Sequence, residues 1–232
     1  MSNSTQPKPA SIEHTRVNKI LLSALEKPAL KWLSEHMPAW VTPDMLTILG
    51  FAASVLIAVS YWLCSYNSAF LWLASFGFVL NWFGDSLDGT LARYRKIERP
   101  KYGFFVDHTV DAVTETLVFV GLGLSPYVDL TLALFALIGY LLVSILVYVY
   151  TYVSGEFRIS YASLGPTEMR AIAILANTLI FFVGNPKLNL GFVEVAVYDL
   201  IVFLIVLLLF IGFFVVVLWR AHQLSLVDRK KS

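Results

Sequence analysis

Six long apolar segments dominate this chain of 232 residues. They cover residues 45–64, 68–87, 103–125, 128–153, 167–184 and 192–219. A helix of about 20 apolar residues crosses the roughly 30 Å of hydrocarbon in a bilayer, so each segment is long enough to span a membrane. Only 14% of the residues are charged, whereas soluble domains carry about 25%. We therefore expect an all-α integral membrane protein with six transmembrane helices.

Basic residues set the expected orientation, because Lys and Arg concentrate in cytoplasmic loops. With six spans, Lys187 is the only one of the 17 Lys and Arg residues that falls on the opposite side. Both termini are therefore expected in the cytoplasm. We divide the chain into a polar tail (1–16), an interfacial segment (17–44), a membrane domain (45–219) and a basic cytoplasmic tail (220–232).

Residues 17–44 have the pattern of an amphipathic helix. Apolar residues recur every three or four positions, at Val17, Ile20, Leu21, Ala24, Leu25, Ala29, Trp32 and Leu33. The charged residues of the other face are Lys19, Glu26, Lys27 and Lys31. This pattern favours a helix that lies in the cytoplasmic interface of the membrane; a soluble helix packed on the membrane domain is the alternative. We expect Pro28 to kink or interrupt the helix.

Four aspartates lie where the second and third spans meet the cytoplasm: Asp85, Asp88, Asp107 and Asp111. Within each span the two aspartates are three or four residues apart, so they share one face of the helix. Ionised carboxylates in a membrane are costly and usually have a partner, yet these spans contain no run of basic residues. The expected partner is bound Mg²⁺ or Mn²⁺, because both metals prefer oxygen ligands. We expect two ions rather than one. The alternative is that the acids are helix caps and solvated loop ends.

Small residues and one arginine surround these aspartates. Gly89 directly follows Asp88, where a side chain would block a ligand and where the backbone needs a permissive conformation. Ala92 keeps the next turn small, and Gly103 allows close approach at the start of the third span. Arg93 offers a planar fork for phosphate oxygens. The ligand that this arrangement favours is a diphosphate bridged to divalent metals.

This pattern resembles the signature of the CDP-alcohol phosphotransferase family. That signature reads Asp-x-x-Asp-Gly-x-x-Ala-Arg, a short spacer, and Gly-x-x-x-Asp-x-x-x-Asp. Every specified residue is present between positions 85 and 111, with a spacer of nine residues that is one longer than the commonest form. The resemblance implies six spans after an interfacial helix, metal ions on the four aspartates, and a CDP site at Gly89, Ala92, Arg93 and Gly103.

The segment that enters the first span also resembles the family. Members often carry Pro-Asn-x-x-Thr near the nucleotide, and this chain has Pro43, Asp44 and Thr47 at the corresponding positions. The resemblance implies that Asp44 and Thr47 contact the nucleotide, although Asp44 departs from the family's asparagine. The alternative is that Thr42 and Asp44 cap the helix.

The resemblance implies a reaction in which an acceptor hydroxyl attacks the phosphorus bonded to the alcohol, and CMP leaves. A general base must take the hydroxyl proton. Asp111 is the family's usual candidate. His108 is the other, because a carboxylate bound to cations is a poor base and a histidine is matched to neutral pH.

Two short segments bear on the substrates. Asp107-His108 and the Gly-Pro-Thr-Glu stretch ending at Glu168 resemble members that use CDP-choline or CDP-ethanolamine with diacylglycerol. The six-span length instead resembles enzymes that use CDP-diacylglycerol and a polar alcohol. Glu168 is a catalytic candidate, or it stabilises the start of its helix. Arg158 and Arg170 bind a phosphorylated acceptor or follow the positive-inside rule.

We therefore expect a phospholipid-synthesising transferase that meets a CDP-alcohol donor, a lipid or polyol acceptor and membrane lipids. We expect a homodimer and no nucleic-acid partner. A divalent-cation transporter is the competing class, since aspartates within membranes also mark ion pathways. It would need acids in the opposite half of the membrane, where Glu194 and Asp199 are the candidates.

Overall fold

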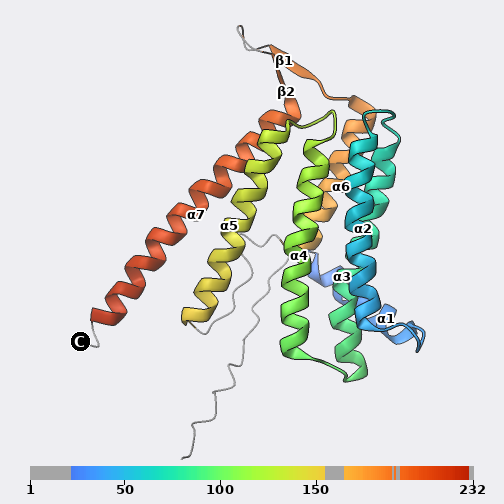
Figure 1. Cartoon of the computed structure of the whole chain (residues 1–232), viewed down its shortest axis with the longest axis vertical. Coiled ribbons are helices and arrows are strands. Elements are labelled where there is room, and N and C mark those ends of the chain that lie inside the picture. Colours follow the sequence, from blue (N-terminus) through green and yellow to red (C-terminus); the bar gives the residue numbers. More distant parts are fainter. Residues whose placement is uncertain (1–21, 155–164, 190, 192–193, 230–232) are drawn as a thin grey trace, which may run out of the picture.

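The computed structural model describes residues 22–154, 165–189, 191 and 194–229. In these residues it has seven helices and one two-stranded sheet (Figure 1). The elements are α1 (Ser23–His36), α2 (Pro43–Leu63), α3 (Phe70–Arg95), α4 (Pro100–Gly123), α5 (Leu130–Ser154), α6 (Pro166–Val183), β1 (Lys187–Asn189), β2 (Glu194–Ala196) and α7 (Val197–Arg229). The prediction of an all-α fold is confirmed for these residues, apart from the short hairpin β1–β2.

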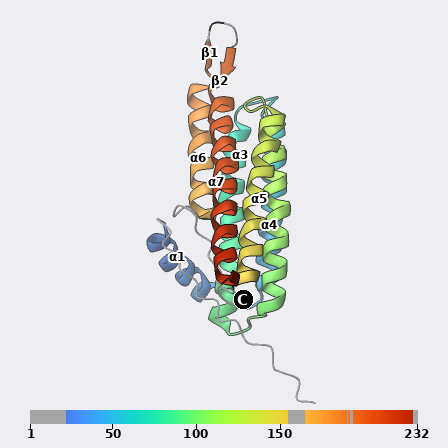
Figure 2. The same cartoon turned by 90° about the vertical axis from the view of Figure 1, so that its left-hand side faces the viewer.

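The helices α2 to α7 run alternately in opposite directions (Figures 1 and 2). Helix α1 lies at the end of the bundle where α3 ends and α4 begins, and the hairpin β1–β2 lies at the other end. We call the end beside α1 the basic end, because Arg93, Arg95 and Arg99 lie there. Helix α6 begins well short of the level at which α3 ends.

Within the described part of the chain, four helices are long and apolar enough to cross a membrane: Pro43–Leu63, Leu130–Val153, Pro166–Val183 and Val197–Leu226. Helices α3 and α4, which carry the four aspartates, do not qualify by composition. Six spans therefore stay a prediction.

The helices extend beyond the predicted apolar spans. Helix α3 runs to Arg95, where Lys96 adopts a left-handed conformation with φ of 58°, and α7 runs through most of the predicted tail 220–232 to Arg229. The difference arises because a change in hydropathy marks where a chain leaves lipid, whereas a helix ends only where the backbone is interrupted.

Helix α1 continues through Pro28, so the helix is not interrupted there, and the kink stays a prediction. Proline has no backbone N–H, so Pro28 cannot bond the carbonyl of Ala24. Both residues are exposed, so the lost hydrogen bond lies at the surface. The packing of α1 on the bundle involves the buried Leu30, and Leu25 and Trp32 are 75% and 58% exposed. These exposed apolar side chains agree with an interfacial helix, whose position at the membrane surface stays a prediction.

Hydrogen bonds tie α1 to two other helices. Glu26, expected on the polar face, instead accepts hydrogen bonds from Trp82 Nε1 of α3 at 2.9 Å and Thr167 Oγ1 of α6 at 2.7 Å. Arg95 of α3 donates to the carbonyls of Met37 at 3.1 Å and Pro38 at 2.8 Å, just beyond α1. Helix α1 is therefore joined to α3 and α6 at the basic end.

Glycines bring α2 into backbone contact with its neighbours. A Cβ on Gly84 of α3 would lie 2.5 Å from Gly50 N and from Leu46 O of α2. A Cβ on Gly121 of α4 would lie 2.5 Å from Ala58 Cα. Helix α2 is thus packed closely against both α3 and α4, the two helices that carry the aspartates.

We predict that Gly84→Ala lowers the free energy of unfolding by about 1–3 kcal/mol, because the added methyl group must push two helix backbones apart. Thermal unfolding of the purified protein in detergent micelles measures the effect. Gly212→Ala is the matched control, since a Cβ there meets nothing within 4 Å and alanine favours a helix interior. A melting temperature for Gly84→Ala at or above the wild-type value would contradict the prediction.

Candidate active site

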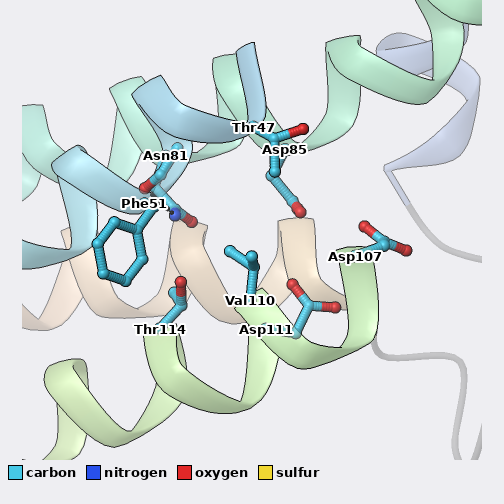
Figure 3. A pocket seen from close by; sticks show the side chains of 9 residues that line it. Thr47, Phe51, Asn81, Asp85, Asp107, Val110, Asp111 and Thr114 are labelled. Carbon is cyan, nitrogen blue, oxygen red and sulfur yellow. Dashed lines mark hydrogen bonds between the residues drawn. The ribbon is translucent and has the colours of Figure 1, made fainter. Parts of the chain in front are cut away.

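A cavity lies between α2, α3 and α4 toward the basic end (Figure 3). It is lined by Thr47, Gly50, Phe51, Asn81, Asp85, Asp107, Val110, Asp111 and Thr114. The three carboxylates gather at one end of the cavity, and Phe51, Asn81 and Thr114 lie toward the other. The structure therefore brings together aspartates that are 26 positions apart in the sequence, as their helix faces predicted.

The fourth aspartate, Asp88, lies beside this cavity and is held by α2. Its Oδ2 accepts a hydrogen bond from Thr47 Oγ1 at 2.6 Å, and its Oδ1 accepts one from the N–H of Gly89. Asp88 also lies close enough to Asp85 and Asp107 for their charges to interact. Thr47 thus links the predicted nucleotide segment of α2 to the carboxylate cluster.

The donor atoms suit a hard divalent cation. Asp107, His108 and Asp111 each offer a ligand atom, and these atoms lie within 4.8 Å of one another. Asp85 faces the same space from α3. Carboxylate oxygens from two helices around one small cavity are the ligand set that Mg²⁺ and Mn²⁺ prefer, so the residues fit the predicted metals.

One expectation needs correction: the aspartates are not without a basic partner. Arg170 of α6, predicted to border a cytoplasmic connection, donates from Nη2 to Asp85 Oδ2 at 2.6 Å and from Nε to Asn81 Oδ1 at 2.8 Å. Asn81 in turn donates to Gly50 O at 2.9 Å. Helix α6 starts at Pro166, one residue before the predicted span 167–184, so Arg170 lies in its second turn; the sequence carries no signal that this turn packs against Asp85.

His108 lies on the side of α4 that faces α5. Its Nδ1 is 3.3 Å from Asp107 Oδ2, and its ring packs against Phe104 and against Tyr148 of α5, with centroid separations of 4.1 and 5.1 Å. The two candidate bases, His108 and Asp111, are therefore both adjacent to Asp107, and their placement alone does not choose between them.

Glu168 is buried, at 4% exposure, and both of its oxygens accept backbone hydrogen bonds. Oε2 accepts from Gly165 N at 3.0 Å and Oε1 from Leu22 N at 2.8 Å. The first bond caps α6, and the second fixes the residue before α1. These contacts favour a structural role; the catalytic role stays a prediction.

The predicted nucleotide residues occupy different surroundings. Asp44 and Thr47 line a mostly apolar groove of about 300 Å³ between α2 and α4, which shares Thr47, Phe51 and Val110 with the aspartate cavity. Asp44 forms an ion pair with Arg99, whose guanidinium lies 4.1 Å from the centroid of the Tyr102 ring. Thr42 caps α2, accepting from Met45 N at 3.3 Å, so the cap and the groove position coexist.

Gly89, Ala92, Arg93 and Gly103 do not line either hollow among the described residues. Ala92 and Gly103 lie one helical turn from Asp88 and Asp107, toward the basic end. A Cβ on Gly103 would meet nothing within 4 Å, and one on Gly89 would meet first the flexible end of Arg93, at 3.3 Å. Packing within the chain therefore does not require glycine at these two positions.

The comparisons with known proteins cover the part of the chain that contains this site. Residues 40–227 match the family described as CDP-alcohol phosphatidyltransferase. Archaetidylinositol phosphate synthase of Pyrococcus horikoshii is 33% identical over 105 residues, which make up 45% of this chain and 52% of that protein. Cholinephosphotransferase 1 of Homo sapiens is 26% identical over 184 residues, covering 75% of this chain and 45% of that protein. This chain spans about half the length of these curated relatives.

Among solved structures, phosphatidylinositol phosphate synthase of Mycobacterium tuberculosis in its apo form aligns with a TM-score of 0.42 and 20% sequence identity. The alignment covers 68% of this chain and 94% of that one.

We predict that Glu168→Ala lowers the free energy of unfolding by about 1–3 kcal/mol, because two backbone N–H groups lose their acceptor. Glu168→Gln keeps one acceptor oxygen and should lose less. Thermal unfolding measures both, with Glu35→Ala as the control, since the described contact of Glu35 is a 3.9 Å ion pair with Lys31 at the surface of α1. A Glu168→Ala protein with wild-type stability and lost turnover would instead support catalysis.

Proposed function

The chain belongs to the CDP-alcohol phosphatidyltransferase family, and we propose that it transfers a phospho-alcohol group from a CDP-activated donor to an acceptor hydroxyl. The observation that carries the proposal is the convergence of Asp85, Asp107 and Asp111 on one cavity, with Asp88 beside it. A cluster of carboxylates in an apolar helical bundle needs cations, and a diphosphate donor needs the same cations.

The proposed metal ligands are Asp85, Asp88, Asp107 and Asp111, with Mg²⁺ or Mn²⁺ as the ion and two ions expected. When bound, such ions neutralise the diphosphate and the charge that develops on CMP. Thr47 orients Asp88 by its 2.6 Å hydrogen bond. Arg93, exposed near the end of α3, is proposed to contact donor phosphate, and the open space at Gly89 and Gly103 is proposed to admit the CDP group.

The nucleoside is proposed to enter the groove between α2 and α4. Its apolar lining and its continuity with the aspartate cavity would place a base in the groove and the diphosphate at the carboxylates. The acceptor oxygen then attacks the phosphorus bonded to the alcohol, the bond from this phosphorus to the CMP oxygen breaks, and His108 or Asp111 takes the hydroxyl proton.

Two substrate pairs are candidates, each favoured by a specific observation. Asp107-His108 and Glu168, together with the match to a cholinephosphotransferase, favour a CDP-amino-alcohol donor with a diacylglycerol acceptor. The match to an archaetidylinositol phosphate synthase favours a CDP-activated lipid with a polyol-type acceptor. CMP release measured with CDP-choline plus diacylglycerol, and with CDP-diacylglycerol plus small polar alcohols, distinguishes the pairs.

We propose six membrane spans with both termini and the aspartates on the cytoplasmic side, and a homodimer whose contacts include part of the exposed apolar surface. Against the transporter alternative, Asp199 accepts a hydrogen bond from Asp129 N at 2.8 Å at the start of α5. Glu194 lies in β2, at the end of the bundle opposite the aspartates. Neither Asp199 nor Glu194 therefore lines the aspartate cavity.

We predict that CMP release stops when divalent ions are chelated and returns when Mg²⁺ or Mn²⁺ is added. Asp107→Asn should lower turnover at least about 100-fold, because the variant loses a charged metal ligand. Asp129→Asn is the matched control: Asp129 caps α5 at the opposite end, through Thr131 N at 2.8 Å. Turnover by the purified protein in excess chelator would overturn the metal assignment.

A second prediction concerns the base. His108→Gln should lower turnover by about 10²–10⁴-fold while donor binding persists, because proton transfer is lost and the aspartates are kept. Asp111→Asn should lose metal binding and turnover together. CMP release gives the turnover, and the shift in unfolding temperature with the CDP donor gives the binding. Near wild-type turnover in His108→Gln would assign the proton to Asp111.

A further inference from the structure

Arg170 is a fixed positive charge inside the carboxylate cluster. Its guanidinium bonds Asp85 at 2.6 Å and Asn81 at 2.8 Å, and the side chains of Arg170 and Asp85 are only 13% and 25% exposed. Its Nη1 is buried without a hydrogen-bond partner among the described residues. Since arginine is always protonated in proteins, this charge is present at every pH at which the protein is folded.

The position of Arg170 is fixed from two directions. On one side, Asn81 holds the guanidinium and is itself bonded to Gly50 O of α2. On the other side, the first turn of α6 is held by contacts from Thr167 to Glu26 and from Glu168 to Leu22. The pair with Asp85 is therefore built into the bundle, unlike a flexible surface contact.

The charge of Arg170 reaches beyond Asp85. It lies close enough to Asp111 and Glu115 of α4 to interact with both electrostatically. Three acidic side chains, Asp85, Asp111 and Glu115, thus lie within electrostatic reach of one arginine, in a setting that screens charge poorly. Removing that arginine leaves the cluster more negative and leaves Asp85 without its partner.

We propose that Arg170 is a built-in counter-charge that neutralises Asp85 when no metal is bound and competes with the metal for this carboxylate. The inference rests on the proposed function, because it takes Asp85 as a metal ligand. A divalent ion at Asp85 must either share the carboxylate with the guanidinium or displace it, and either arrangement places like charges close together. Arg170 therefore stabilises the metal-free bundle and weakens metal binding.

The test is a titration of the purified full-length protein with Mn²⁺, followed by electron paramagnetic resonance of the free ion. We expect Arg170→Gln to bind Mn²⁺ about tenfold more tightly than the wild type, because one competing charge is gone. In chelator the same variant should unfold at a lower temperature than the wild type, since Asp85 is left unpaired.

Two further variants sharpen the comparison. Arg170→Lys keeps the charge but loses the fork that bonds Asn81 and Asp85 together, so its Mn²⁺ affinity should lie between those of the wild type and Arg170→Gln. Arg170→Lys also replaces Arg170→Gln in the test if the latter does not fold without metal. Arg220→Gln is the matched control, because Arg220 of α7 bonds Tyr150 of α5 at 2.8 Å, outside the aspartate cavity. It should bind Mn²⁺ as the wild type does.

The possible failures are distinguishable. If the wild type binds Mn²⁺ and both Arg170 variants bind it equally or more weakly, Arg170 is a structural clamp or a supporting group of the metal site. That result overturns the counter-charge proposal and leaves the proposed function standing. If the wild type shows no Mn²⁺ binding, the metal assignment falls and the counter-charge falls with it.

Discussion

Repulsion among carboxylates is the constraint on which the rest of this structure depends. Asp85, Asp107 and Asp111 face one cavity in an apolar bundle, where like charges interact strongly. The protein holds them there by bonding the flanking groups: Thr47 to Asp88, and Arg170 to Asp85. Each of these bonds joins a different pair of helices, so the contacts that stabilise the carboxylates also hold helices of the bundle together.

Helix α2 makes this arrangement possible although it carries none of the four aspartates. Its backbone touches α3 where Gly84 meets Gly50 and α4 where Gly121 meets Ala58. Such close approach fixes the depth and the rotation of both acidic helices, because any side chain at the contact would separate the backbones. The distance between the two aspartate pairs is therefore set by residues with almost no side chain of their own.

Sequence reasoning predicted the parts that depend on local pattern. The spacing of Asp85, Asp88, Asp107 and Asp111 placed each pair on one helix face, and the apolar segments predicted the helices, because both patterns have helical periods. The environment of Arg170 was not predictable in this way. The start of α6 was predicted to within one residue, but the packing of α6 against α3, which brings Arg170 to Asp85, involves contacts with Glu26 and Leu22 more than 140 positions earlier.

The contacts of α1 have a consequence for the order in which the protein is made. Helix α1 leaves the ribosome before every span, yet Glu26 and Leu22 bond to Thr167 and Glu168, which follow 141 and 146 positions later. Until α6 has been synthesised, α1 lacks these two bonds, whereas its packing against α2 and α3 and the bond to Trp82 can already form. The first helix of the described chain thus completes its native contacts only after α6 has been made.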